Sequence, residues 1–153
     1  MARLRYTVPA LLVALTLSAC GGDSGTGPED EIVDGGGNGN TDTRVIKSDP
    51  SFANDIQEIF NRRGCAAGFC HGSAQSAGLN LMAGSSYASL VNVTATQSTA
   101  ARVIPGNAQD SYLVVKLEGR QTVGARMPVN GAALDNIDLT NIKNWISRGA
   151  NNN

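Results

Sequence analysis

Two cysteines and the only histidine of the chain lie within seven residues of one another, at Cys65, Cys70 and His71. Two thiols, with an imidazole directly after the second, are the groups that a c-type haem requires. The thiols add across the two vinyl groups of the porphyrin, and the imidazole binds the iron from one face. Four residues separate these cysteines, where two are typical. Gly68 gives the longer loop freedom to turn, so the cluster predicts covalent haem attachment.

Three other interpretations of this cluster remain open. Cys65 and Cys70 also suit a disulfide that closes a small loop, with His71 as an ordinary surface residue. A zinc site needs four ligands, whereas these three are crowded together and the sequence offers no fourth cysteine or histidine beside them. A nucleophilic cysteine assisted by His71 is disfavoured, because a neighbouring second cysteine in an oxidising compartment would capture it.

An iron bound by His71 needs a second ligand or keeps an open position. No second histidine exists in the chain, so the candidates are methionines. Met82 lies shortly after His71 and follows two leucines, so it is interpreted as core filling. Met127 lies far along the chain and is followed by a proline that stiffens its loop. The sequence therefore favours Met127 as the ligand on the opposite face of the haem.

The N-terminus has the pattern of a bacterial secretory signal. Two arginines precede an apolar run over residues 8–17 that is too short to span a bilayer comfortably. The run ends in Leu-Ser-Ala-Cys, which resembles the lipobox, where cleavage frees the cysteine for acylation. We therefore expect a signal peptide over residues 1–19 and a lipid on Cys20. Gly21 follows the cysteine, which favours an outer-membrane anchor facing the periplasm or the exterior; an ordinary signal peptide with a chance cysteine is the alternative.

Residues 20–44 form an expected tether. They are rich in Gly, Asn and Asp and carry few apolar side chains. Such a segment cannot bury enough apolar surface to offset its chain entropy, so it is predicted to be disordered. The whole chain has a net charge of −1 and 5% aromatic residues. No part of it is basic enough for nucleic-acid binding.

Residues 45–153 are predicted to be a small all-α domain. Apolar residues recur at helical spacing near both ends. The first set follows Asp49-Pro50-Ser51, which offers a cap and a proline suited to a first helical turn, and it ends at Gly64. The last set follows Asp138 as a plausible cap and ends at Gly149. Shorter helices are expected over residues 86–91 and 110–117. The two apolar stripes are Phe52, Ile56, Ile59 and Phe60, and Leu139, Ile142, Trp145 and Ile146.

The segment from Phe52 to Ala150 resembles the small cytochrome c domains of the planctomycete type. The resemblance lies in the order and spacing of short segments more than in any one of them. It implies a class I cytochrome c-like fold, in which the first and last helices cross and a methionine, here Met127 before its proline, closes the sixth position of the iron. The segments are 56–60, 78–81, 103–107, 110–113, 126–128 and 144–150.

The expected function is electron transfer by one covalent haem c, with redox proteins of the cell envelope as partners and no enzymatic activity. A haem-free binding or structural lipoprotein with a Cys65–Cys70 disulfide is the alternative. A small peroxidase lacks support, because no distal histidine is present. Arg102 and Arg126 are candidates for pairing with haem propionates, although solvated surface charge is favoured for both. Trp145 is expected in the core.

Overall fold

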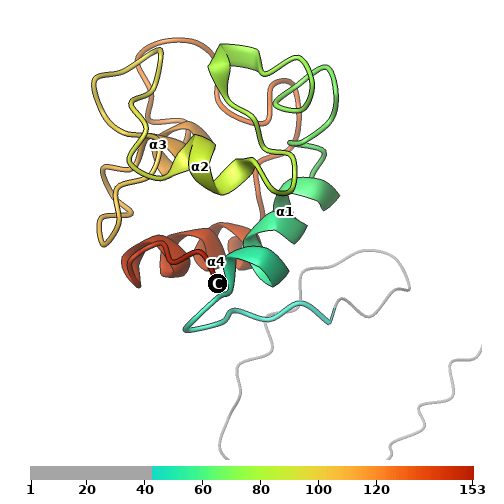
Figure 1. Cartoon of the computed structure of the whole chain (residues 1–153), viewed down its shortest axis with the longest axis vertical. Coiled ribbons are helices and arrows are strands. Elements are labelled where there is room, and N and C mark those ends of the chain that lie inside the picture. Colours follow the sequence, from blue (N-terminus) through green and yellow to red (C-terminus); the bar gives the residue numbers. More distant parts are fainter. Residues whose placement is uncertain (1–42) are drawn as a thin grey trace, which may run out of the picture. The chain divides into compact units, whose positions relative to one another are not determined.

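The computed structural model describes residues 43–153, which belong to one compact unit (Figure 1). The signal peptide expected over residues 1–19, the lipidated Cys20 and most of the 20–44 tether lie outside the described residues. Within residues 43–153, helices take up 34% of the chain and no strand forms. Two isolated bridges, Val91 with Val103 and Thr94 with Ala101, are the only β-pairings there. The all-α prediction is confirmed.

The first helix begins at the predicted apolar stripe, and its N-cap is Ser51, the last residue of the expected capping segment. Ser51 is extended and its hydroxyl accepts a hydrogen bond from the N–H of Asn54 at 3.4 Å. The chain then forms one π-helical stretch, η1 (Phe52–Ile56), which continues directly as α1 (Gln57–Arg62). The four stripe residues are buried. Gly64 follows with φ +69°, a left-handed conformation that glycine adopts without strain, and the helix ends before it.

The middle of the domain holds short helices joined by loops. They are η2 (Ser76–Gly78), α2 (Ser86–Leu90) and α3 (Tyr112–Glu118). The helix expected over 86–91 is confirmed. The one expected over 110–117 starts later, because Asp110 pairs with Asn107 in the preceding turn and Ser111 takes the cap position.

The last helix, α4 (Asn136–Ser147), begins at a different cap from the one expected. Asp135 is the N-cap, and its carboxylate accepts the N–H of Asp138 at 2.9 Å. The prediction of Asp138 as the cap is wrong, because that side chain points inward and is 1% exposed. The arginines that surround both carboxylates form what we call the Arg–Asp cluster: Arg44, Arg62, Arg63, Asp135 and Asp138.

The core lies between the two ends of the chain. η1 and α3 each pack against α4. Phe52, Tyr87 and Trp145 form an aromatic group with ring centroids 5.1–6.5 Å apart. Trp145 is 1% exposed, which confirms its expected place in the core. Within residues 43–153, no helix has the length and apolar character needed to cross a bilayer.

Candidate cofactor site

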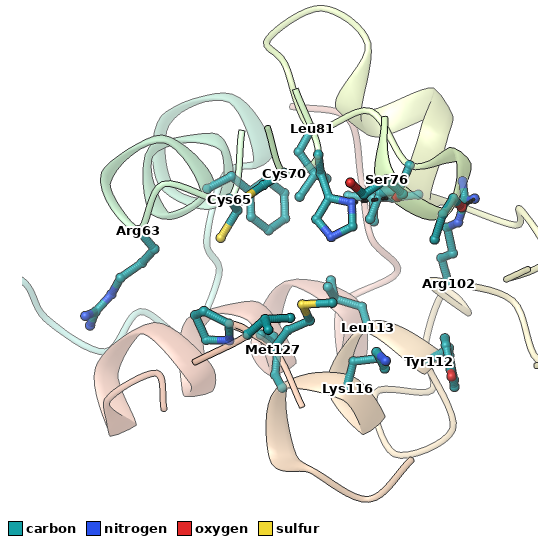
Figure 2. A pocket seen from close by; sticks show the side chains of 18 of the residues that line it. Arg63, Cys65, Cys70, Ser76, Leu81, Arg102, Tyr112, Leu113, Lys116 and Met127 are labelled. Atoms are coloured by element: carbon teal, nitrogen blue, oxygen red, sulfur yellow. Dashed lines mark hydrogen bonds between the residues drawn. The ribbon is translucent and has the colours of Figure 1, made fainter. Parts of the chain in front are cut away.

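A cavity of about 750 Å³ opens between the loop after α1, the helix α3 and the loop before α4. This volume is within the usual range for small-molecule and cofactor sites. Its walls are mainly apolar, and it brings together all four side chains that the sequence predicts as haem ligands or attachment points, Cys65, Cys70, His71 and Met127 (Figure 2). Apolar side chains of the wall include Ile59, Phe60, Leu79, Leu81, Leu90, Leu113, Leu117, Leu134 and Ile142.

One wall of the cavity is the loop that carries both cysteines. This loop starts where α1 ends, so the helix places Cys65 at the edge of the core. The ring nitrogen Nδ1 of His71 lies 2.9 Å from the carbonyl oxygen of Ser76. A carbonyl only accepts, so Nδ1 carries the proton and Nε2 keeps its lone pair. A metal-binding histidine commonly has this arrangement, with one nitrogen held by a backbone oxygen and the other free.

Burial sets the protonation of both groups in this loop. Burial lowers the pKa of His71, against the opposing effect of its hydrogen bond to Ser76. The imidazole is therefore neutral at pH 7 and available as a ligand. Burial also raises the pKa of the Cys65 thiol, and the neighbouring Cys70 adds to the shift. Cys65 consequently stays a thiol, and neither cysteine is part of a disulfide in the structure.

The opposite wall holds Met127. Its backbone N–H donates to the carbonyl of Lys116 at 2.9 Å, which fixes the loop to α3. Figure 2 shows the Met127 side chain across the cavity from Cys65 and Cys70, with its sulfur directed into the space. Met82, the other candidate, does not line the cavity and is 47% exposed. The interpretation of Met82 as core filling is wrong, because it lies in a loop that turns outward before α2.

Two cations line the end of the cavity away from Cys65. Arg102 and Lys116 are each 8% exposed, and within residues 43–153 neither forms an ion pair. Burial lowers the pKa of both. Arg102 donates to the carbonyls of Ser89 and Ala77, at 2.8 and 3.0 Å, so the expectation of solvated surface charge is wrong for it. Arg126 does not line the cavity and donates to the carbonyl of Gly131.

Lys116 is the site residue that sequence analysis missed. Its ammonium group donates to Gln97 Oε1 at 3.2 Å and to the carbonyl of Val123 at 3.4 Å. A signal was present, since Lys116 interrupts an apolar run and stands four residues after Tyr112, on the helix face that Tyr112 shares. Figure 2 shows Arg102, Tyr112 and Lys116 together at this end of the cavity.

Within the described part of the chain, no three His, Cys, Asp or Glu side chains form a cluster suited to a metal ion. Comparisons of the chain with protein-family models, with curated proteins and with solved structures gave no match.

Proposed function

We propose that this chain is a c-type cytochrome, anchored through a lipid on Cys20, that holds one haem in the cavity and carries electrons between redox proteins of the cell envelope. The observation that carries the proposal is the convergence of Cys65, Cys70, His71 and Met127 on one apolar cavity of about 750 Å³, although Met127 lies far along the chain. Among the described residues, no other histidine, cysteine or methionine lines this cavity.

The residues of the cavity suit a covalently bound haem. Cys65 and Cys70 are free thiols and would hold the porphyrin through thioether bonds. His71, neutral and with Nε2 unprotonated, would bind the iron on one face, and the thioether of Met127 on the other. The group itself supplies reversible one-electron exchange between ferric and ferrous iron. The apolar walls exclude water and favour the less charged ferrous state.

The cations at the far end of the cavity match the charge of this ligand. A haem carries two propionate carboxylates on one edge, and Arg102 and Lys116 are buried cations that lack an acidic partner in residues 43–153. A buried charge costs free energy unless it is paired. Carboxylates at this end would therefore stabilise both side chains and orient the ring with its opposite edge toward the cysteines.

The packing of the helices supports a cytochrome c-like fold. η1 leads directly into α1, and it packs against α4 from the other end of the chain. The cavity lies beside this pair of helices, because Ile59 and Phe60 of α1 and Ile142 of α4 all contribute to its wall. The two helices thus provide a fixed support for the cysteine loop.

With His71 and Met127 both bound to the iron, no open position would remain for a substrate, so the proposed activity is electron transfer and not catalysis. A reduced-minus-oxidised visible spectrum of the full chain, produced together with a c-type haem maturation system, tests the proposal. We expect the bands of a low-spin haem c, and their loss in Cys65→Ser/Cys70→Ser. A colourless wild-type protein under these conditions would refute the proposal.

The methionine ligand has its own test with a matched control. Met127→Ala should abolish the charge-transfer band of a methionine–iron bond, because the side chain lies in the cavity wall. Met82→Ala should leave the band unchanged, because this side chain is exposed and outside the cavity. Retention of the band in Met127→Ala would exclude Met127 as the ligand.

A further inference from the structure

The backbone of the cysteine loop is held by hydrogen bonds at both cysteines. The N–H of Cys65 donates to the carbonyl of Phe60 at 2.8 Å, and its carbonyl accepts the N–H of His71 at 3.1 Å. The N–H of Cys70 donates within the loop at 2.9 Å, and its carbonyl accepts the N–H of Ser76 at 3.1 Å. Every backbone N–H and C=O group of the two cysteines therefore forms a hydrogen bond. These bonds fix the backbone positions from which the two thiol side chains project.

The loop closes on Gly72, the residue after the histidine. The N–H of Gly72 donates to the carbonyl of Ala67 at 3.0 Å, and this same oxygen accepts the N–H of Cys70. Gly72 is buried although its neighbours are exposed or half-buried. A β-carbon at this position would overlap the carbonyl oxygens of Ala66 and Ala67, the second at 2.7 Å. Both contacts are with backbone, so they are not relieved by rotating a side chain.

These contacts explain how the loop accommodates four residues between its cysteines. Ala66 and Ala67 fold back onto Gly72, so the extra residues form a closed turn. We propose that Gly72 is the positioning residue of the attachment site: the close backbone approach at this position sets the relative placement of both thiols and the imidazole. The inference rests on the proposed haem attachment and adds a specific residue to it.

Placement matters because two bonds form to one rigid ring. In each addition the sulfur bonds to a vinyl carbon and the thiol hydrogen ends on the adjacent carbon, so no external oxidant or reductant is required. Once the first bond has formed, the second thiol must already lie beside its vinyl group. A misplacement of about 1 Å at a reacting group can cost about 100-fold in rate.

Gly72→Ala tests the proposal, with Gly68→Ala as the matched control. Both variants add one methyl group to the same loop. At position 68 the added carbon meets only the side-chain oxygen of Ser73 at 3.3 Å, so little has to move. We expect Gly68→Ala to carry two thioethers, like wild type, and Gly72→Ala to carry at most one, at less than a tenth of the doubly attached yield.

Two readouts separate positioning from a general loss of structure. The α-band of the alkaline pyridine haemochrome distinguishes one thioether from two, and iodoacetamide labelling counts the thiols left free. Measured on the haem-free chains, the fluorescence of Trp145, buried in the helical core, reports whether that core is intact. Double attachment of Gly72→Ala at the wild-type level would overturn the proposal.

If Gly72→Ala fails to fold, a measurement on the haem-free wild-type chain tests whether the cysteine loop is closed before haem attachment. Amide hydrogen exchange should show the N–H groups of Cys70, His71, Gly72 and Ser76 protected before any haem is present, because the loop is already closed. Free exchange of these amides beside a protected α4 would show that the loop is not preformed, and would overturn the proposal. Absence of haem from wild type, with the loop amides protected, would instead refute the proposed cytochrome function.

Discussion

Cations gather in two regions of this domain, and the two regions differ in the groups that the cations contact. In the Arg–Asp cluster, Asp138 is 1% exposed and accepts from Arg44 Nη1 at 2.8 Å and Arg62 Nη2 at 2.7 Å, as well as from Arg63. Asp135 pairs with Arg44 and Arg63. At the cavity, Arg102 and Lys116 are more deeply buried than these arginines, at 8% exposed each, and within residues 43–153 their hydrogen bonds go only to neutral oxygens.

The difference separates charges that are neutralised by acidic side chains of the fold from charges that line a cavity. The Arg–Asp cluster joins the segment before η1, the end of α1 and the first turn of α4, so its charges are satisfied within the protein. Arg102 and Lys116 have carbonyl and amide contacts but no carboxylate partner in the part of the chain that the structure describes, and an unpaired buried charge is costly. Their place in the wall of a cavity is consistent with a ligand that brings the missing carboxylates.

The largest effect is expected from Asp138→Asn. The substitution removes the fully buried carboxylate that three arginines share, so each arginine loses one ion pair, while Asp135 and Glu58 remain as acidic partners. We expect a loss of about 3 kcal/mol in the free energy of unfolding, measured by urea denaturation. Glu118→Gln is the control, since Glu118 pairs with Arg120 and Lys143 near the surface and should cost less than about 1 kcal/mol. Equal losses would show that the cluster does not stabilise the fold more than a surface pair.

The second prediction concerns the cations at the cavity. The haem-free full chain should bind protohaem at least about tenfold more tightly than protohaem dimethyl ester, because charged hydrogen bonds typically contribute about 1.5–3 kcal/mol. Arg102→Gln/Lys116→Met should abolish this preference. Arg126→Gln should preserve it, because Arg126 lies outside the cavity wall. If wild type bound protohaem and its dimethyl ester equally tightly, Arg102 and Lys116 would not be the partners of the haem carboxylates.

The smallest effect is expected in the pH dependence of stability. Burial lowers the pKa of Lys116 in the folded chain, so the unfolded chain binds more protons between the folded and unfolded pKa values. The stability of the haem-free chain should therefore rise as the pH increases through the folded pKa of Lys116. Lys116→Met should remove this rise and stabilise the haem-free chain by on the order of 1 kcal/mol. If the stability of Lys116→Met had the same pH dependence as that of wild type, the inference that Lys116 is an uncompensated buried charge would be contradicted.

The two regions also show what a sequence can and cannot predict here. The helical stripes were predicted correctly because periodicity is a local property. Cys65, Cys70 and His71 lie within seven residues of the sequence, so their proximity could be predicted without knowledge of the fold. Met127 was placed opposite them by resemblance and by elimination, and the structure brings it to the same cavity.

The errors fall on residues whose surroundings come from distant parts of the chain. Asp138 has the residue type and position of a cap, and only the approach of Arg44 and Arg62 makes it a buried partner. Arg102 is drawn inward by the carbonyls of Ser89 and Ala77. Tertiary packing determines the burial of these side chains, and a local sequence pattern does not predict it.

The most direct test of the account is the mass of the Cys65–Cys70 region in the mature protein. Proteolysis and mass spectrometry of the full chain, produced with a haem maturation system, should yield a peptide heavier by one haem, with both cysteines resistant to alkylation. A haem-free peptide two hydrogens lighter than its dithiol form would show the two sulfurs joined to each other, and would contradict the central claim.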